Sequence, residues 1–346
     1  MRHLVYNACK RLVCPAQSVF NSWLRNMPNS YKHVVTRYLL LLILTPVFML
    51  PSSAASQKQP LTEQNESLSS KLDEERLHWS QLKYKATLLG FSVKSQVNLV
   101  SLPANETDAA LIESKNDKAV SSSSDNNYYM TLHTNLLGRD LRTMIWFDPT
   151  DVRALQRIRL ETGVKQNEYK AYRFTENGTF MIRKQPKTEE VDLSHESWTN
   201  TNSEYAKLLP KSANQLMLAE PASLFYIVSV AELSHPGDAI EIPMLSRGSV
   251  LMVRLTVEKR KTYNATYTRK KRSSDNEVNH NVDALEISIR ARSIDSPTES
   301  FDLKLAGLDG DLRFIVDRET HIPLELSGKM VILGTVRFKL EHAVVH

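Results

Sequence analysis

Apolar and polar residues alternate with a period of two along most of the chain after its first 80 residues. The alternation runs from Tyr84 to Leu88, and it resumes after Leu89-Gly90 from Phe91 to Leu99. A period of two is typical of a β-strand, and a phase shift at a glycine indicates a hairpin turn or a bulge. The sequence therefore predicts a hairpin at this point.

More strand signals follow, separated by turn residues. They are Tyr128 to Leu136, Leu141 to Phe147, Leu155 to Leu160, Tyr169 to Phe174, Thr179 to Arg183, Ile240 to Leu245, Val250 to Val257, Leu285 to Ala291, Phe301 to Leu305, Leu312 to Val316, Leu324 to Leu326 and Met330 to Leu340. Asn177-Gly178 is a strong hairpin signal because both residues tolerate positive φ. The predicted fold class is mostly β, a single antiparallel curved sheet or open barrel domain with one or two short helices.

Two stretches have helix signals. Pro221 to Leu233 begins with a proline, which suits a first turn, and His235-Pro236-Gly237 follows its end. Its Ile- and Val-rich core also fits a buried strand, and we favour the helix. A shorter helix is expected from Ser70 to Trp79, with Ser70 as its cap.

Three polar stretches interrupt the pattern. Pro103 to Asn127 contains the serine run Ser121 to Ser124, and Glu258 to Val282 is rich in Lys and Arg. Both are predicted to be flexible inserts, at 103–127 and 258–282, because they hold too little apolar area to offset the entropy lost on ordering. Gln185 to Asn214 is predicted to be a long loop or lid.

The segment from Tyr38 to Leu50 is an apolar run that follows basic residues and precedes the small residues Ser53-Ala54-Ala55. This arrangement indicates a secretory signal peptide, and the run is short for a bilayer-spanning helix of about 20 residues. The predicted organisation is a leader over 1–55, a linker over 56–80 and a β-rich domain over 81–346. The expected location is periplasmic.

Alternatives for the leader stay open. An uncleaved run would leave the protein anchored in the inner membrane, and a basic, acid-free segment also fits a mitochondrial-type presequence. Met27 would begin a signal of more ordinary length, so the true start is predicted there.

The leader changes what the composition means. The formal net charge is +5, but residues 1–55 hold six Lys and Arg and no acidic residue, so the rest carries 5 − 6 = −1. A near-neutral chain gives no argument for nucleic-acid binding. Both cysteines, Cys9 and Cys14, lie in the leader, so the exported part has no disulfide, thiolate metal site or cysteine nucleophile.

The end of the chain resembles a bacterial exported, periplasmic β-rich domain family of unknown function. The resemblance rests on Leu312 to Asp317, His321 to Leu324 and Leu333 to Leu340, together with Tyr84 to Val100 and Pro221 to Tyr226. It spans most of residues 82–342. It implies an exported β-rich domain of a Gram-negative envelope with a curved sheet or open barrel, and it supplies no catalytic residues.

Catalytic and metal motifs are weak. Ser80-Gln-Leu-Lys83 and Ser124-Asp125-Asn126 imitate two of three penicillin-binding motifs, but Lys-Thr-Gly is absent and Ser80 precedes a strand. Asp309-Gly310-Asp311 offers two carboxylates where calcium needs six to eight oxygens, so a turn is the better interpretation. No catalytic, cofactor-binding or metal-ligating residue is assigned.

Two His–Asp pairs, Asp317 with His321 and His235 with Asp238, have the composition of acid–base pairs. Each pair lies at a predicted turn beside a proline. We therefore expect solvated loop residues.

The basic insert combines cations with Tyr263 and Tyr267, the composition of a surface that contacts anionic lipid. The candidate contact residues are Lys259, Arg260, Lys261, Arg269, Lys270, Lys271 and Arg272. An ordinary solvated loop is the alternative.

The sequence thus predicts a non-enzymatic exported protein, with no cofactor, that binds a lipid-like or other hydrophobic ligand in a curved sheet. Large residues such as Phe91, Trp146, Phe174 and Phe314 would line the concavity, unless they fill a closed core. In that case the alternative is a cell-envelope assembly or scaffolding factor that contacts envelope proteins. A hydrolase of an envelope polymer is the third hypothesis. Membrane contact is expected to be peripheral after signal cleavage.

Overall fold

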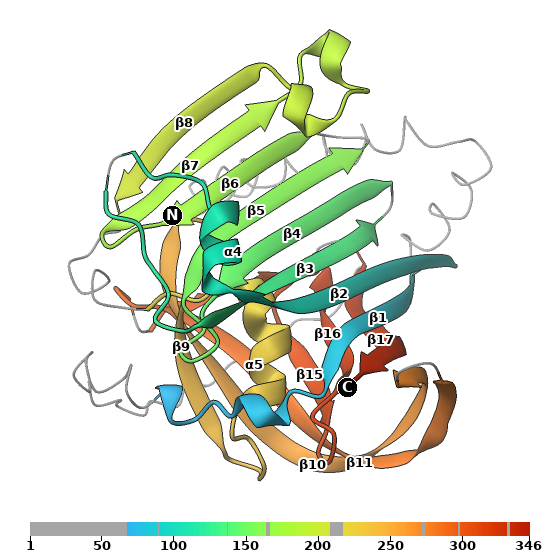
Figure 1. The fold of residues 1–346 in the computed structure, drawn as a ribbon. Helices are drawn as coiled ribbons and strands as arrows, with labels where there is room; N and C mark the ends of the chain where they lie inside the picture. The colour runs from blue at the N-terminus through green and yellow to red at the C-terminus, as the bar shows by residue number, and fades with distance from the viewer. Residues whose placement is uncertain are drawn as a thin grey trace, which may run out of the picture. The chain divides into compact units, whose positions relative to one another are not determined.

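The chain forms one large β-sheet in the computed structural model, which describes residues 68–346 apart from 89, 116, 137, 164–166, 208–216, 272–273, 297 and 331–332. The strand order is β8-β7-β6-β5-β4-β3-β2-β1-β17-β16-β15-β11-β10-β9 (Figure 1). The predicted fold class is confirmed, since the sheet is mostly antiparallel and does not close into a regular barrel. The predicted leader and the first part of the linker lie outside the described residues.

The first eight strands form a meander in which each strand pairs with the next. Their bounds are β1 (Trp79–Leu88), β2 (Phe91–Pro103), β3 (Asn126–Leu136), β4 (Arg139–Phe147), β5 (Ala154–Gly163), β6 (Glu168–Phe174), β7 (Gly178–Gln185) and β8 (Asn200–Lys207). The predicted hairpin at Gly90 is confirmed. Gly90 has φ +85°, a conformation that glycine adopts at little steric cost.

The second half adds nine strands. Their bounds are β9 (Ala239–Ser246), β10 (Ser249–Lys271), β11 (Ser274–Ser293), β12 (Ser300–Phe301), β13 (Lys304–Leu305), β14 (Leu308–Asp309), β15 (Arg313–Asp317), β16 (Pro323–Met330) and β17 (Gly334–Val345). The last strand, β17, lies between β1 and β16 and so joins the two halves. β13 and β14 pair separately as a two-stranded sheet.

Two α-helices and several single turns of 3-10 helix connect the strands. They are α4 (Ala104–Ala110), α5 (Leu224–Val230), η1 (Glu74–Arg76), η2 (Thr188–Glu190), η3 (His195–Ser197) and η5 (Pro221–Ser223). The helix predicted from Pro221 is confirmed, as η5 followed by α5. The helix predicted from Ser70 is only the turn η1, which Asp73 caps by accepting the Glu75 N–H.

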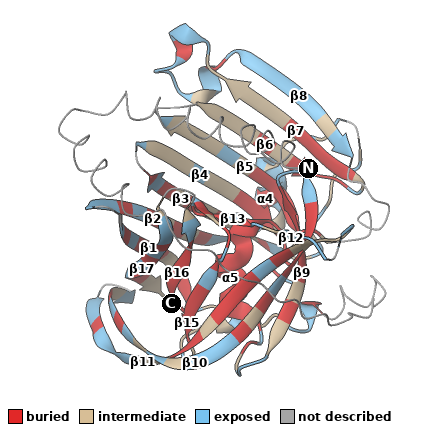
Figure 2. Cartoon of the chain, turned by 180° about the vertical axis from the view of Figure 1, so that it is seen from behind, coloured by how far each residue is buried: buried red, intermediate tan, exposed pale blue. Residues whose placement is uncertain are grey.

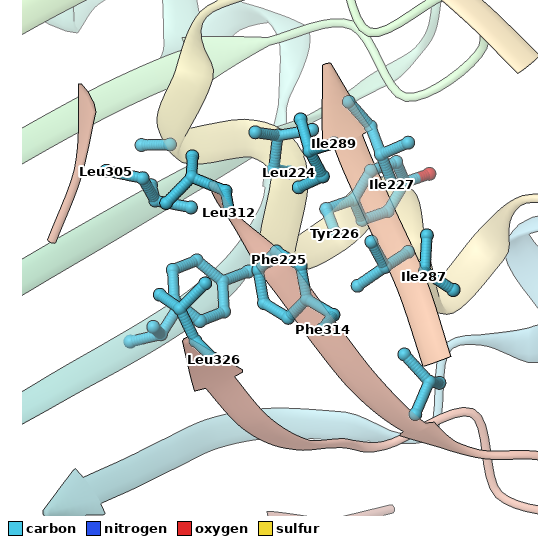
Figure 3. Close-up of a cluster of buried hydrophobic side chains, with 14 of the residues drawn as sticks. Leu224, Phe225, Tyr226, Ile227, Ile287, Ile289, Leu305, Leu312, Phe314 and Leu326 are labelled. Atoms are coloured by element: carbon cyan, nitrogen blue, oxygen red, sulfur yellow. The ribbon is translucent and has the colours of Figure 1, made fainter. Parts of the chain in front are cut away.

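α5 packs against the concave side of the sheet, and all seven of its residues are buried (Figure 2). The ring of Phe225 lies 5.7 Å from that of Tyr84 on β1 and 5.2 Å from that of Phe314 on β15. Figure 3 shows this cluster of apolar side chains from α5 and the second half of the sheet. Burying a large aromatic side chain stabilises a fold by about 3 kcal/mol. Because Phe225 contacts strands of both halves, α5 stabilises the packing of the two halves.

The basic segment 258–282 is not the flexible insert that we expected. It forms the far parts of β10 and β11, which pair in continuous register from Lys259↔Glu286 to Lys271↔Ser274. The sequence does alternate here, because Tyr263, Ala265 and Tyr267 point to the inside while polar residues point outward. Because these apolar residues are few, the strand signal in the sequence is weak.

The end of this hairpin folds back onto the last strand. Thr268 to Lys271 of β10 pair in parallel with His342 to Val345 of β17, beyond the part of β17 that pairs with β16. Figure 1 shows the hairpin curving toward β17. The pairing supplies backbone partners for a polar segment, which explains how the segment is ordered without a large apolar face.

The segment 103–127 also differs from the flexible insert that we expected. It begins with α4, and its serine run is bound to the buried carboxylate of Asp148, which accepts hydrogen bonds from the hydroxyls of Ser122 and Ser124 at 2.7 and 2.6 Å. A buried carboxylate requires such donors. The partner that orders the segment lies more than 20 residues away in the sequence.

The expected long loop 185–214 contains a strand that the sequence pattern did not predict. β8 is an edge strand whose residues are exposed except for the half-buried Tyr205, so it has no apolar period. The hairpin predicted at Asn177-Gly178 is confirmed, but neither residue has positive φ. Gly178 is needed for space instead, since an added Cβ would lie 2.4 Å from the Ala206 carbonyl oxygen of β8.

Candidate functional site

The side of β1 to β4 that points away from α5 carries a ladder of hydrogen-bonded polar side chains, which we call the outer polar face. The Asn98 amide oxygen accepts hydrogen bonds from Gln81 at 2.7 Å and Gln96 at 2.9 Å. Its amide nitrogen donates to Thr131 Oγ1 at 2.9 Å. All four side chains are partly exposed, so the ladder offers a fixed set of donors and acceptors to a polar partner.

The ladder continues into an ionic cluster at the same face. Asp140 contacts His133 Nε2 at 2.7 Å and accepts a hydrogen bond from Arg142 Nε at 2.9 Å. Burial by itself would raise the pKa of Asp140, but the bonds from His133 and Arg142 outweigh it and lower that pKa. The carboxylate therefore stays ionised and orients both partners, which suits binding better than proton transfer.

Three residues of the predicted basic contact are paired with carboxylates. Lys259 and Lys261 lie 3.6 and 3.0 Å from Glu286 Oε2, and Arg260 Nε lies 2.6 Å from Asp283 Oδ1. The two carboxylates also pair with Arg313 and Arg318, so they offset only part of this positive charge. These exposed pairs contribute little stability individually.

The other predicted contact residues lie near the end of the hairpin. Arg269, Lys270 and Lys271 are part of β10, beside the last residues of β17, and Arg272 lies outside the described residues. Lys270 and Lys271 are exposed. The structure therefore separates the seven predicted residues into a paired group and a group at the hairpin end.

The two tyrosines of this segment are not available for stacking. Tyr267 is 6% exposed, and the Tyr263 hydroxyl donates to Glu325 Oε2 at 3.1 Å. Burial, together with the charge of Glu325, raises the pKa of Tyr263. The expected combination of basic and aromatic contacts is not assembled, because strand alternation turns the tyrosines inward.

Asp317 and His321 are not the solvated loop residues that we expected. Asp317 is 6% exposed, and its carboxylate accepts the backbone N–H of Glu319 at 2.9 Å, which stabilises the turn. The His321 ring instead lies against the Arg76 guanidinium, with Nε to Nε2 at 3.1 Å. Burial first, and then the charge of Arg76, lower the pKa of His321 to about 4. These residues do not form an acid–base pair.

His235 and Asp238 do fit the expectation of a solvated loop. Asp238 Oδ2 accepts the backbone N–H groups of Ser234 and His235 at 2.9 and 2.8 Å. The His235 ring is 73% exposed and lies 3.8 Å from the carboxylate.

The remaining sequence motifs have structural partners. Asp309 pairs with Arg247 at 2.8 Å, and Asp311 pairs with Lys329. Ser80 and Lys83 lie on the strand β1, whereas penicillin-binding chemistry needs the serine to open a helix. Within the ranges that the structure describes, no group of three or more His, Cys, Asp and Glu residues is placed to hold a metal ion.

Two of the hollows among the described residues are shallow and polar. One, of about 410 Å³, lies beside Arg260 and Asp283, and the other, of about 450 Å³, lies beside Glu74, Ser124 and Tyr128. In the second hollow Tyr128 donates to Glu74 Oε1 at 2.5 Å.

The large residues proposed to line a concavity have different environments. Phe174 and Phe314 are 2% and 0% exposed, and Trp146 is 7% exposed. Phe91 is 47% exposed at the hairpin end of β2.

The sequence pattern did not predict the outer polar face or the role of Asp148. The alternating polar residues in β1 to β3 are a sequence signal for the outer polar face. Asp148 has no such local signal.

Comparison with known proteins adds no relative, since no family description, curated protein or solved structure matches this chain. Among the described residues, no helix has the length and apolar character needed to cross a membrane.

Proposed function

We propose that this protein is a non-enzymatic exported protein of a Gram-negative cell envelope that acts as an assembly or scaffolding factor through its outer surface. The observation that carries the proposal is the position of α5. Its seven buried residues occupy the concave side of the sheet, where a hydrophobic ligand would otherwise bind. A partner would therefore bind to the exposed surfaces rather than to the concave side of the sheet.

The outer polar face is the best candidate for such a contact. Its side chains are held by one another through Asn98 and Asp140, so a partner would not have to order them on binding. Half-buried Tyr129 lies beside the ladder, with its ring 4.7 Å from that of Trp146. A tyrosine next to fixed polar groups is typical of protein contact surfaces.

The carboxylates of the described sheet support binding rather than hydrolysis. Glu286 is bound by Lys261 and Arg313 at 3.0 and 2.8 Å, and Glu325 by Arg337 at 3.2 Å. A general acid of a polymer hydrolase needs a raised pKa. Although burial would raise it, the pKa of Glu286 is lowered by its cationic neighbours.

Photo-crosslinking in a Gram-negative host tests the proposal. A photoreactive residue at position 131, in place of Thr131, should give one dominant adduct in the periplasmic fraction, and Asn98→Ala should remove that adduct. The matched control is the same residue at position 266, since Thr266 is an exposed strand threonine on β10. Equal labelling from both positions would contradict a specific outer face.

Native mass spectrometry of the same preparation tests the carrier alternative. We expect no co-purifying lipid, and we expect Ile145→Glu to unfold the protein because Ile145 is 0% exposed in the core. A folded Ile145→Glu variant that loses a lipid carried by the wild type would overturn the scaffolding proposal.

Mass spectrometry of the same preparation also tests export. A mature N-terminus close to Ser56 is expected, and an intact leader on a cytoplasmic protein would contradict export.

A further inference from the structure

The large sheet ends in two edge strands, β9 and β8, and the edge at β9 is protected. β9 contains Pro243, which has no N–H group to offer to another strand. The segment before η5 also lies along this edge. The Ala219 N–H donates to the Pro243 carbonyl oxygen at 2.9 Å, and the Leu245 N–H donates to the Ala219 carbonyl oxygen at 3.0 Å. A proline and a covering segment are two of the ways in which natural proteins prevent edge-to-edge pairing.

The edge at β8 has no such protection. β8 pairs with β7 in continuous register, so it has no bulge, and it contains no proline. Within the part of the chain that the structure describes, the backbone of β8 is bonded to β7 alone, and Figure 1 shows β8 as the border strand of the sheet. Residues 208–216, which follow it, lie outside the described residues. The N–H and C=O groups that point away from β7 are therefore available to another strand.

The side chains of β8 suit a close neighbour. Most are small and polar, and Glu204 and Lys207 are the only charged residues of the strand. Tyr205 is half-buried, and its hydroxyl donates to Asp117 Oδ2 at 2.9 Å. This bond fixes the ring, so a second strand that packs beside it would not have to order it.

We propose that β8 pairs antiparallel with β8 of a second copy of this chain, about a twofold axis at Ser203. In this register Thr201 of each copy lies opposite Tyr205 of the other, and the symmetry makes two such pairs. Pairs of an aromatic and a β-branched residue are among the favourable cross-strand pairs. Thr201 meets Tyr205 only where Ser203 meets Ser203, so no other antiparallel register of the two strands gives these contacts.

Other partners and registers fit β8 less well. A register centred on Glu204 places two carboxylates directly opposite each other, and like charges in that position destabilise a sheet. A register centred on Tyr205 pairs only residues 203–207 of the described strand. With Ser203 at the centre, Glu204 lies opposite Asn202, whose amide group is a hydrogen-bond donor. A second copy therefore supplies a complementary edge, and a twofold axis is the commonest symmetry of protein dimers.

The register also decides which way the two copies face. Residues directly opposite each other have their side chains on the same side of a sheet. A row of paired residues joins Ser203 to the outer polar face, and it consists of Ser203, Ile182, Ala171, Ile158, Met144 and Thr131. Both outer polar faces therefore lie on one side of the dimer. Two linked sites bind a repeated partner more tightly than one, a consequence that rests on the proposed function, whereas the dimer does not.

Disulfide crosslinking tests the register, because Cys9 and Cys14 are the only cysteines of the sequence. In the full chain with Cys9→Ser and Cys14→Ser, Ser203→Cys should give a covalent dimer under mild oxidation. The Cβ atoms of directly opposite residues are about 5 Å apart, which is close to the spacing that a disulfide needs.

Two matched variants control this experiment. Thr201→Cys lies on the same strand and the same side of the sheet, but the two copies of position 201 would be four residues apart along the strands, or about 13 Å. Ser92→Cys is an exposed position on the interior strand β2 and measures random collision. Both variants should lose the crosslink.

A charge swap at the same position tests the dimer without a cysteine. Ser203→Lys and Ser203→Glu each place like charges opposite each other at the axis, so each should weaken dimerisation in sedimentation equilibrium by about fivefold. An equal mixture of the two variants should associate at least as tightly as the wild type, because opposite charges then face each other. Ser92→Lys should behave like the wild type. Circular dichroism establishes that each variant is folded.

Three results would overturn the proposal. They are a wild-type protein that stays monomeric at its highest soluble concentration, a Ser203→Cys variant that crosslinks no faster than Thr201→Cys, and a mixture of charged variants that associates no better than either alone. A Ser203→Cys variant that forms a mixed disulfide with another protein in a Gram-negative host, and none with itself, would assign the edge to that protein instead. Photo-crosslinking from position 131 concerns the outer polar face, so its failure is distinct from failure of these assays.

Discussion

Replacing Asp148 with asparagine should release the serine run from the sheet and destabilise the protein. Asp148 is 0% exposed, and its Oδ2 accepts the Ser122 hydroxyl at 2.7 Å and the Ser123 backbone N–H at 2.9 Å. Its Oδ1 accepts the Ser124 hydroxyl at 2.6 Å, and the Thr150 backbone N–H and hydroxyl at 3.0 and 2.7 Å. All of these partners are hydrogen-bond donors, so both carboxylate oxygens of Asp148 must act as acceptors.

Asparagine has the same shape but replaces one acceptor with an NH₂ group. Whichever way the amide is turned, the NH₂ group faces a backbone N–H, that of Ser123 or that of Thr150. A buried donor left without an acceptor costs about 1–3 kcal/mol, and bonds that lose their charge weaken by roughly 1 kcal/mol each. We therefore expect a loss of about 3 kcal/mol in the free energy of unfolding, which is large beside a typical total of about 5–15 kcal/mol.

The same carboxylate makes a pH-dependent contribution. Burial by itself would raise the pKa of Asp148, but hydrogen bonds from Ser124, Ser122 and Thr150 outweigh it and hold that pKa well below its ordinary value. A carboxyl whose pKa is lower in the folded state stabilises the fold above its unfolded pKa of about 3.9 and loses this contribution as the pH falls. The difference between wild type and Asp148→Asn should therefore narrow below about pH 4.

Urea unfolding followed by tryptophan fluorescence at neutral and acidic pH measures both effects. Limited proteolysis should also cut the variant faster within Ser121 to Asp125. The matched control is Asp125→Asn, the same chemical change at an exposed carboxylate of the same segment, which should stay within about 0.5 kcal/mol of the wild type. The reasoning fails if Asp148→Asn is as stable as the control, or if its deficit does not change with pH.

Two further predictions concern a buried ion pair and a half-buried histidine. Arg157 Nη1 donates to Glu220 Oε1 at 2.9 Å with both side chains below 8% exposed, so Arg157→Met should cost about 3–5 kcal/mol in urea unfolding. Adding Glu220→Gln should recover part of that loss, and no recovery would contradict an ion-pair effect. Burial, Arg76 and His78 lower the pKa of His321 to about 4. The unfolded chain then binds more protons between about pH 4 and 6.5, so stability should rise with pH across that window, and His321→Asn should flatten the rise. An NMR titration that gives His321 a pKa near 6.5 would refute this prediction.

Local pattern was enough to predict most strands and the class of the fold. Strand periodicity is a property of neighbours in the sequence, so Tyr84 to Leu99 and the pairs of strands around short turns were readable without tertiary contacts. The stretch from Pro221 was readable as a helix from its proline and the residues that end it. None of this required knowing which strand pairs with a distant one.

Alternation identifies two faces of a strand but not which face meets the core. Ile145 and Trp146 are neighbours of similar character, yet Ile145 packs in the core with α5 while Trp146 points to the opposite side, beside Tyr129. The sequence pattern therefore left open whether the concave side is open or filled. The answer depends on α5, which contacts strands from both ends of the chain.

Only the tertiary structure decided which polar segments are ordered. Residues 258–271 are strand because their end pairs with β17, and the serine run is ordered because Asp148 needs donors. Lys339 likewise becomes a neighbour of Lys85 only through the pairing of β17 with β1, since the two residues are far apart in the sequence. A local pattern records apolar burial, whereas these features depend on backbone pairing and on charges that meet across the fold.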